Sequence, residues 1–461
     1  MNKRVCILCT NFARARALLN FCRNESYLVR SSAELDESVS NKLDNNLKPR
    51  HHPGVMDHRT VSLPEDIKKS IGKLLSGEVP KKQMLREAQP LEKYLMARRV
   101  PVEKTEYFNK RLEVMNEVRN TLEVNIESLP QDEQDSWNKM INNKVDQLLK
   151  KKLYSWNQID FTEYMSKLYL VTRSAAEYAV VYKTLQEIYK RTNFVPSTVF
   201  DFGSGVGSVI WAANSIWGRL IKEYYCVDSS NHMNALSEEI VKQCDNNITK
   251  RIFYRQFLPA SKDITSDLVV SSYSLLELPS KENRLETVIN LWKRTGKYLV
   301  LIEIGSQGGF KVLNEARTEI LNHTKQSNVD KEESYIFAPC PHHHSCPRSN
   351  LKCFFEASYT SFPQRPETLR KELYSYIIFA KGERGEVDNE WPRIVQPVLC
   401  RSRHVICRLC CSSGDLKEVI VTPSKHGKKA YRCAKASRWG DLFPFKLKPH
   451  ENMTSEEKQN D

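Results

Sequence analysis

Three cysteines and three consecutive histidines lie within one short stretch of this chain, "FAPCPHHHSCPRSNLKCFF" at 337–355. Thiolate and imidazole groups are strong ligands for transition metals, so this segment is a candidate metal site. A disulfide framework is disfavoured, because the chain has 13 cysteines, an odd number, and no export signal. Cys340, Cys346 and Cys353 are therefore candidate ligands. The histidines at 342–344 are weaker candidates, because three adjacent rings cannot all point at one ion.

The spacing of the cysteines helps to separate the kinds of metal centre. Zinc sites favour two thiolates separated by about two to four residues, whereas the gaps here are five and six residues. Such gaps suit a larger centre, a cube of iron and sulfide held by thiolates. "CRLCC" at 407–411 supplies another thiol, with Cys410 as the first choice and Cys407 as the second. An iron–sulfur cluster is the preferred interpretation, and zinc or unliganded core cysteines are the alternatives.

A glycine-rich loop is the second candidate site. "VFDFGSGVGSVIWAA" places Gly203, Gly205 and Gly207 directly after an apolar run and before a helical pattern. Glycines let the backbone turn tightly and approach a ligand closely, and the start of a helix offers unpaired N–H groups. The next apolar run ends at Asp228, where a carboxylate could accept both hydroxyls of a ribose. The loop therefore predicts a cofactor with a nucleoside.

The spacing of the glycines indicates which cofactor. A dinucleotide fold would show G-x-G-x-x-G, whereas this loop is G-x-G-x-G and is preceded by Asp201. The form "DFGSGVG" resembles the first motif of the class I S-adenosyl-L-methionine-dependent methyltransferases. The resemblance implies that the loop of Gly203, Gly205 and Gly207, with Asp201 before it, surrounds the methionine end of S-adenosyl-L-methionine. It also implies that Asp228 holds the ribose.

The residues that would catalyse methyl transfer are missing from the expected place. Amino-methylating members of that family carry an Asn/Asp-Pro-Pro-aromatic run after the fourth strand, where this chain has "SSYSLLELPS" at 271–280. A pyrimidine carbon-5 methyltransferase would need a cysteine there. The Pro-Cys pair at 339–340 comes after the fifth strand, which is the wrong place. We therefore expect no catalytic residue, and cofactor binding without turnover.

Short apolar runs alternate with helical stretches around the glycine loop. The runs lie at 197–203, 224–228, 267–273 and 297–305. Uninterrupted apolar strands separated by helices indicate a parallel sheet that is covered on both faces. The sequence therefore predicts an α/β fold, with a class I (Rossmann-like) methyltransferase domain at 161–330.

The remaining chain shows four further regions. The first 24 residues contain five basic residues, no acidic residue and several apolar ones, a pattern typical of a mitochondrial presequence. Helical periodicity is clear in several segments after residue 62. The predicted divisions are a presequence at 1–30, a linker and N-terminal helical region at 31–160, a cysteine-rich iron–sulfur and RNA-binding extension at 331–450, and a disordered tail at 451–461.

The charge of the chain favours a polyanionic partner. The formal net charge is +14 and the pI is about 9.1. Between 393 and 448 there are thirteen Lys or Arg residues against three acidic ones, which indicates nucleic-acid binding. No apolar run approaches the roughly 18 residues of a membrane span, so we expect no membrane insertion.

Several motifs together identify the chain as similar to one family. They are "FDFGSGVGSVIWAANSIWG", "QFLPASKDITSDLVVSSYSLLELPSK", "FAPCPHHHSCP", "WPRIVQPVL", "RHVICRLCC" and "YRCAKASRWGDL". They resemble the mitochondrial methyltransferase-like proteins that act in assembly of the small ribosomal subunit. The resemblance covers most of the chain, from about 49 to 445.

The resemblance implies a function as well as a fold. It implies a mitochondrial matrix protein that binds the maturing small ribosomal subunit, its rRNA and its proteins, and is needed for mitochondrial translation. It further implies a 4Fe-4S cluster on Cys340, Cys346, Cys353 and Cys410, and S-adenosyl-L-methionine binding without methyl transfer. Away from the ribosome we expect a monomer. The alternatives are an active rRNA methyltransferase and a binding module stapled by zinc.

Overall fold

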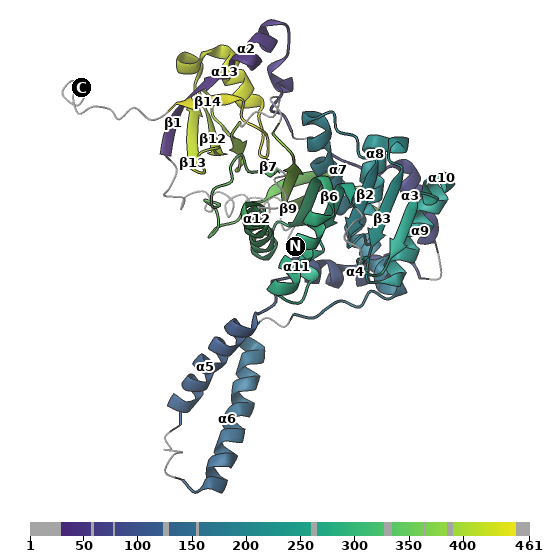
Figure 1. The fold of residues 1–461 in the computed structure, drawn as a ribbon, viewed down its shortest axis with the longest axis vertical. Coiled ribbons are helices and arrows are strands. Elements are labelled where there is room, and N and C mark those ends of the chain that lie inside the picture. Colours follow the sequence, from purple (N-terminus) through teal and green to yellow (C-terminus); the bar gives the residue numbers. More distant parts are fainter. Residues whose placement is uncertain are drawn as a thin grey trace, which may run out of the picture. The chain divides into compact units, whose positions relative to one another are not determined.

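The computed structural model describes the chain between residues 29 and 448 with short gaps (Figure 1). The described ranges are 29–56, 60–76, 79–122, 129–153, 156–259, 265–326, 334–363, 366–384 and 391–448. The predicted tail and all but the last two residues of the predicted presequence lie outside them. The chain folds into two compact units, one at 57–389 and one that combines residues up to Met56 with those from Glu390 onward. No helix of the described ranges is long and apolar enough to cross a membrane.

The larger unit is built on an eight-stranded sheet. Its main path runs β4-β3-β2-β5-β6-β9-β7, and β8 pairs with β9. The strands are β2 (Thr198–Phe202), β3 (Glu223–Val227), β4 (Ile252–Arg255), β5 (Ser266–Ser272), β6 (Thr295–Ile304), β7 (Ser334–Ala338), β8 (Phe355–Thr360) and β9 (Leu369–Lys381). The first five are mutually parallel, whereas β9 is antiparallel to β6, β7 and β8. This topology confirms the predicted class I methyltransferase fold.

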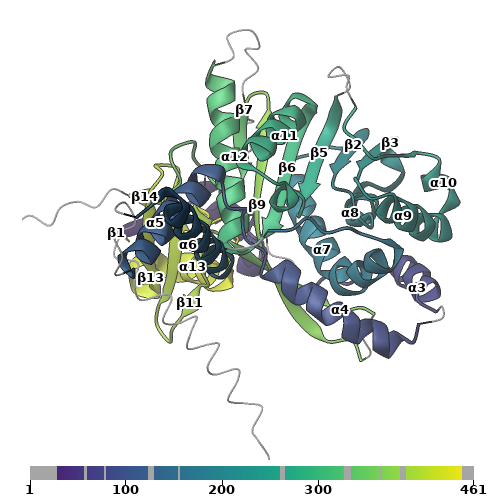
Figure 2. The same ribbon diagram turned by 90° about the horizontal axis from the view of Figure 1, so that it is seen from below.

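Helices cover both faces of this sheet. Figure 2 shows β5 and β6 between α11 on one side and α7 on the other. The helices that follow the parallel strands are α8 (Ser208–Trp217), α9 (Asn231–Cys244), α10 (Asn246–Thr249), α11 (Lys281–Lys293) and α12 (Gln307–Gln326). The long α7 (Glu163–Arg191) packs against α8 and α9. Val181, Leu185 and Ile188 recur at helical spacing on α7 and are fully buried.

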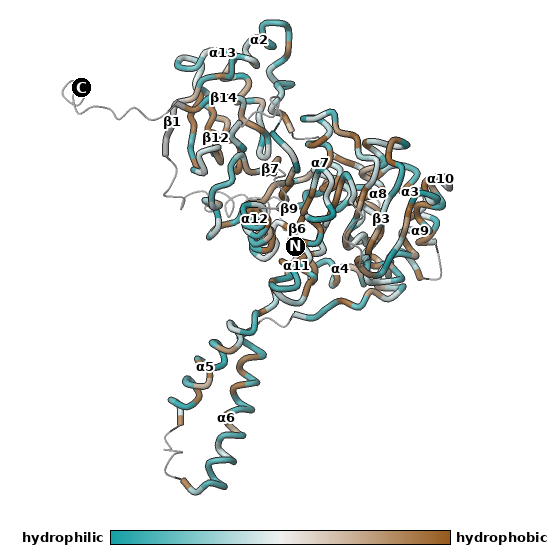
Figure 3. The backbone as a smooth tube through the Cα atoms, in the orientation of Figure 1, coloured by the Kyte–Doolittle hydropathy of each residue, from teal (hydrophilic) through white to brown (hydrophobic). Residues whose placement is uncertain are grey.

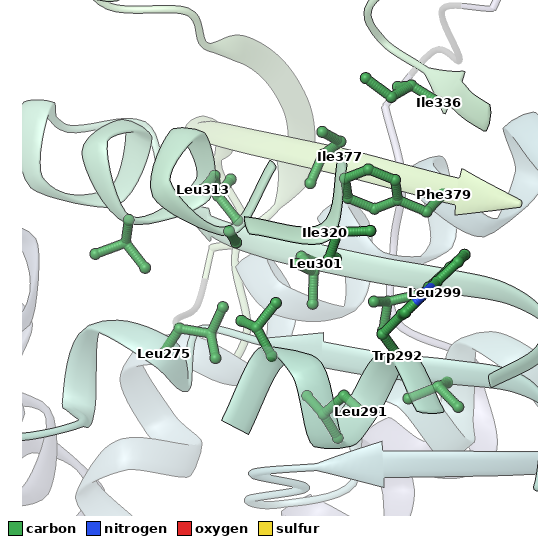
Figure 4. Packing of buried hydrophobic residues seen from close by; sticks show 14 of the residues in the cluster. Leu275, Leu291, Trp292, Leu299, Leu301, Leu313, Ile320, Ile336, Ile377 and Phe379 are labelled. Carbon is green, nitrogen blue, oxygen red and sulfur yellow. The ribbon is translucent and has the colours of Figure 1, made fainter. Parts of the chain in front are cut away.

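The core under α11 and α12 holds the sheet rigidly in place. Trp292 and Leu291 of α11 and Ile320 of α12 meet Leu299 of β6 and Phe379 of β9 in one apolar cluster (Figure 4). These side chains are all buried, so the carboxyl ends of the parallel strands, where the glycine loop begins, have a fixed support.

In the described ranges, four helices precede α7 in the larger unit. They are α3 (Glu65–Leu74), α4 (Lys81–Met96), α5 (Lys104–Asn120) and α6 (Gln131–Lys152). Helices α5 and α6 pack against each other through a small apolar cluster that includes Val114, Val118, Ile141 and Val145. Most of their remaining surface is hydrophilic (Figure 3).

The smaller unit contains a six-stranded sheet with α13 (Pro423–Ala436) packed on it. The strand order is β10-β12-β13-β1-β14, and β11 pairs with β12. The strands are β1 (Val29–Leu35), β10 (Arg393–Ile394), β11 (Leu399–Cys400), β12 (Val405–Cys410), β13 (Leu416–Val421) and β14 (Phe445–Lys448). The unit also includes α2 (Glu37–Asp44) and the short 3-10 turn η1 (Pro49–His51).

The structure divides the chain differently from the sequence-based prediction in two places. Residues 31–56, predicted as linker, form β1, α2 and η1 and belong with the C-terminal unit, because β1 pairs with both β13 and β14. The predicted extension at 331–450 is split, because β7, β8 and β9 complete the sheet of the methyltransferase-like unit. The cysteine segment 337–355 therefore lies in one unit and the segment 407–411 in the other.

Candidate cofactor cavity and cysteine segments

The glycine loop connects β2 to α8 and has the backbone shape that only glycine adopts easily. Gly203, Gly205 and Gly207 have φ values of +70°, +50° and +94°, all in the left-handed region. A Cβ at Gly203 would lie 2.1 Å from the hydroxyl oxygen of Ser274, whereas a Cβ at Gly205 would meet no atom closer than 3.9 Å. The backbone at Gly205 therefore has open space beside it, as a loop that surrounds a ligand requires.

The carboxylate of Asp228 lies at the end of β3 and contacts the loop directly. Its Oδ2 accepts the N–H of Gly205 at 2.9 Å, and its Oδ1 accepts the N–H of Ser230 at 2.9 Å. Burial raises the pKa of Asp228, while these two backbone hydrogen bonds lower it. The structure thus brings the predicted ribose acid to the predicted glycine loop.

Asp201 occupies a different environment from Asp228. Its side chain is buried, it does not line the cavity, and neither carboxyl oxygen has a hydrogen-bond partner in the described ranges. Burial, and after it the charges of Asp228 and Glu177, raise the pKa of Asp201 well above its usual range. Burial in this position therefore disfavours the charged form of the Asp201 carboxyl.

A cavity of about 390 Å³ opens above the loop. Gly203, Ser204, Gly205 and Asp228 line one part of it, and the hydroxyl of Ser204 is buried without a partner in the described ranges. Further lining comes from the segments 95–98, 158–161, 256–258 and 272–278, and from Arg173 and Glu177 on α7. The volume and the open glycine surface fit the size and shape of a nucleoside cofactor.

Several residues that line this cavity could not be recognised from the sequence. Gln256, Phe257 and Leu258 follow β4, and the side chain of Phe257 is 77% exposed at the cavity. The short strand β4 gave only a weak sequence pattern, so the residues after it could not be recognised. Tyr273, after β5, has a φ of +57°, which is strained for a residue with a side chain.

Two carboxyl groups line the part of the cavity beyond β5 and β6. Glu303 is buried and accepts the N–H groups of Leu275 at 2.8 Å and Leu276 at 3.1 Å. Burial raises the pKa of Glu303 to about 8. Burial also raises the pKa of Glu277 to about 7, against the opposing effect of its ion pair with Arg98. Neither group was expected from the sequence.

The first cysteine segment connects β7 to β8. Cys340, Cys346 and Cys353 are half-buried thiols that form no disulfide. Burial raises the pKa of Cys346 to about 11, and its neighbour Cys340 raises it further, whereas Arg317 and Arg348 lower it. Cys340 and Cys346 are therefore close enough to interact electrostatically.

The histidines of this segment serve the fold. The backbone carbonyls of His342 and His344 accept hydrogen bonds from Arg317 at 3.0 and 2.7 Å, and the ring of His343 accepts the N–H of Ile336 at 3.2 Å. Burial lowers the pKa of His342 to about 4, so its ring is neutral. These contacts hold the loop that carries the cysteines.

Strand β12 carries both candidates for the fourth ligand, Cys407 and Cys410, and places them in different surroundings. Side chains alternate along a strand, so Cys407 and Cys410 point to opposite faces. Cys407 is fully buried in the apolar cluster under α13, whereas Cys410 lies on the other face beside Val395 and Leu416. The side chain of Cys407 therefore packs in the apolar core, which leaves Cys410 as the better candidate for the fourth ligand.

In the part of the chain that the structure describes, no group of metal-binding side chains lies close together. No three His, Cys, Asp or Glu side chains there are close enough together to hold an ion. The donor chemistry nevertheless fits a thiolate-bound centre, because the described cysteines of both segments are thiols outside any disulfide.

Comparison with known proteins places these features in a family. The family model described as "Mitochondrial small ribosomal subunit Rsm22" matches residues 163–444. The human protein "Ribosome assembly protein METTL17, mitochondrial" is 38% identical over 404 residues, which cover 86% of this chain and 85% of that protein. "Ribosome assembly protein RSM22, mitochondrial" of Saccharomyces cerevisiae is 23% identical, over 58% of this chain and 65% of that protein.

Solved structures resemble one part of the chain. A SAM-dependent methyltransferase from Aquifex aeolicus covers 48% of this chain and 99% of its own, with 14% identity and a TM-score of 0.30. Magnesium protoporphyrin IX methyltransferase from Synechocystis covers 55% and 99%, with 12% identity and a TM-score of 0.29.

The resemblance inferred from the sequence motifs is confirmed by the family match and by the human relative, which spans most of both chains. The chain belongs to the family described as mitochondrial small ribosomal subunit Rsm22.

Proposed function

We propose that this chain is a mitochondrial matrix factor for assembly of the small ribosomal subunit, and that mitochondrial translation depends on it. In this proposal it binds rRNA and ribosomal proteins, and binds S-adenosyl-L-methionine without methylating RNA. It also carries a 4Fe-4S cluster and is a monomer away from the ribosome. Family membership supports the ribosomal assignment, since the human and yeast relatives are named as mitochondrial ribosome assembly proteins.

The basic surface of α13 is the observation that carries the RNA-binding part of the proposal. The helix contains no acidic residue, and after a kink at Gly427 its Lys428, Arg432 and Lys435 are exposed at helical spacing. The turn that holds Arg401 and Arg403 adjoins the end of this helix, since Cys400 Sγ lies 4.0 Å from the carbonyl oxygen of Lys435. Cations grouped in this way suit the phosphates of an RNA backbone.

A charge-removal experiment tests this surface. The triple variant Lys428→Gln, Arg432→Gln and Lys435→Gln is expected to weaken binding to a hairpin of the mitochondrial small-subunit rRNA. The slope of log K against log salt should fall by about 0.7 to 0.9 for each phosphate that the variant no longer neutralises. The measurement is a salt titration by fluorescence anisotropy.

The matched control changes three exposed lysines of the other unit, Lys222, Lys242 and Lys250, to glutamine. It removes the same charge and should leave the slope nearly unchanged. Equal slopes for the two triple variants would remove α13 from the RNA interface.

The cofactor assignment is supported by the fit of the cavity. Gly203, Gly205 and Gly207 would surround the methionine end of S-adenosyl-L-methionine, and Asp228 would hold its ribose, with Asp201 beneath the loop. The open space at Gly205, the unpartnered hydroxyl of Ser204 within the described ranges and the volume of the cavity all suit such a ligand. When bound, that cofactor supplies an electrophilic methyl group.

Gly203→Ala is the sharpest test of the loop. The new methyl group would meet Ser274 at 2.1 Å on a backbone with φ of +70°, so S-adenosyl-L-methionine binding should be lost in calorimetric titration. The free energy of unfolding should fall by about 2 kcal/mol or more. Gly72→Ala on α3, where no atom lies within 4 Å, is the control and should keep binding. Full binding by Gly203→Ala would contradict the loop assignment.

An active rRNA methyltransferase is the second candidate, and the carboxyl groups at the far part of the cavity favour it. Glu277, with a pKa of about 7, could accept a proton from a methylated group. The two candidates separate in cells that carry a loop variant such as Gly203→Ala. A missing base methylation in the small-subunit rRNA supports the enzyme, whereas unchanged modification supports the scaffold.

The proposed cluster would be held by Cys340, Cys346, Cys353 and Cys410. The interaction of Cys340 with Cys346, and the position of Cys410 on the face of β12 opposite to the apolar cluster under α13, support this set. Because metal binding is coupled to folding, loss of the cluster would destabilise the segments that hold it.

A further inference from the structure

An arginine and a glutamate on α7 line the cavity wall, and the arginine also pairs with a second glutamate, Glu372. Arg173 and Glu177 lie one helical turn apart, and both line the cavity beside the glycine loop. Arg173 donates from Nη2 to Glu372 at 2.8 Å and from Nε to Glu177 at 3.4 Å. All three side chains are less than one tenth exposed. One buried cation therefore serves two buried carboxylates.

Both members of the pair keep a polar atom that the protein satisfies poorly. Among the described residues, the contact of Arg173 Nη1 is the sulfur of Met96 at 3.4 Å, which is a weak acceptor. Oε2 of Glu177 accepts from the hydroxyl of Ser208 at a long 3.4 Å. Buried charged atoms with such weak partners are unfavourable unless a ligand supplies better ones.

The position of the pair indicates which part of a ligand it would meet. Ser208 is the first residue of α8 and directly follows Gly207, so Glu177 lies at the start of that helix. Asp228, the proposed ribose ligand, accepts from Gly205 in the middle of the loop. The pair therefore lies at the end of the loop away from the ribose position, where the methionine end of the cofactor is expected.

We propose that Glu177 binds the α-ammonium group of S-adenosyl-L-methionine and that Arg173 binds its α-carboxylate. This rests on the proposed cofactor binding and extends it to two residues outside the glycine motif. A zwitterion complements such a pair, because each charged group of the ligand meets its opposite. The cofactor also carries a net positive charge from its sulfonium, which matches the excess carboxylate of the set formed by Arg173, Glu177 and Glu372.

Three related ligands test the assignment by calorimetry on the full chain. They are S-adenosyl-L-methionine, its decarboxylated form, which keeps the ammonium group and the sulfonium, and 5′-methylthioadenosine, which lacks both the amino-acid part and the sulfonium charge. Glu177→Gln should lower the affinity for the first two ligands by about tenfold or more and leave the affinity for methylthioadenosine unchanged. Arg173→Lys keeps the positive charge that faces Glu372. It should lower only the affinity for S-adenosyl-L-methionine, by about tenfold.

A second Arg–Glu pair on α7 provides the matched control. Arg191 and Glu187 have the same spacing, and Glu187 is buried while Arg191 is largely covered. Glu187 accepts from the hydroxyl of Tyr376 at 2.7 Å, but neither residue lines the cavity. Glu187→Gln should leave the affinities for all three ligands unchanged.

The outcomes distinguish this proposal from the cofactor assignment itself. If the Glu177 and Arg173 variants weaken methylthioadenosine as much as S-adenosyl-L-methionine, the pair only supports the shape of the cavity and the proposal fails. Unchanged affinities in both variants overturn it as well. If the unmodified chain binds none of the three ligands, the cofactor assignment fails first.

Discussion

Anaerobically purified protein is expected to be brown and to contain about four irons and about four sulfides per chain. Cys340→Ser and Cys410→Ser should each remove the colour and most of the iron, because a cube held by thiolates does not survive the loss of one ligand from either segment. The measurement is the visible absorption spectrum together with iron and sulfide analysis.

Two cysteines outside the proposed ligand set serve as controls for these variants. Cys244 is half-buried on α9 and matches the exposure of Cys340, while Cys411 is buried and adjoins Cys410. Cys244→Ser and Cys411→Ser should keep the colour and the iron. A colourless protein that contains one zinc would show that the site binds zinc in place of an iron–sulfur cluster. A metal-free protein with intact thiols would contradict any metal site.

Loss of the cluster should also be visible in the folding of the protein. The proposed ligands lie on the loop at 340–353 and on β12, and the folding of each segment would depend on the bound cluster. Because binding free energy of a metal centre is folding free energy, Cys410→Ser should be cleaved faster by trypsin than Cys411→Ser.

The methyltransferase-like fold could be predicted because its signals are local. The apolar runs that became β2, β3, β5 and β6 are buried on both faces and therefore uninterrupted in the sequence. The glycine loop was recognisable for the same reason, since its turn, its ligand space and the helix start all lie within one short segment. The chemistry of Asp228 followed from its place at the end of β3.

The parts that could not be predicted depend on pairing between distant segments. Residues 29–35 mix apolar and polar residues, and nothing near them in the sequence shows that their partners are β13 and β14 at the other end of the chain. The cavity residues Arg173 and Glu177 gave only helical periodicity, because their role comes from the fold that brings α7 beside the glycine loop. A sequence pattern indicates whether a residue is buried or exposed in its own helix or strand, but not which distant segment it contacts.

Removal of residues 1–36 is therefore expected to unfold the smaller unit while the unit at 57–389 stays folded. β1 lies between β13 and β14, with which it forms a parallel pair and an antiparallel pair. Ala33 of β1 packs into the apolar cluster under α13, and Asp36 after it accepts the indole N–H of Trp391 at 3.3 Å. Without this strand, β13 and β14 would each lose a neighbour in the sheet.

The expected size of the effect is comparable to the stability of a small domain. Each backbone hydrogen bond contributes about 0.5 to 1.5 kcal/mol, and β1 pairs through seven residues, so the total is about 5 kcal/mol or more. Small domains are stable by about 5 to 15 kcal/mol. Hydrogen exchange should show loss of protection in β13 and β14 and unchanged protection in β5 and β6.

A shorter truncation that ends at residue 28 is the control, because it keeps all of β1. It should preserve protection in β13 and β14 and binding to rRNA, whereas the longer truncation should abolish both. The predicted presequence at 1–30 overlaps β1 at Val29 and Arg30, which pair with Lys417 and Glu418. Stability of the C-terminal unit therefore requires that any processing of the chain stop before Val29. Equal protection in the two truncations would show that β1 is dispensable.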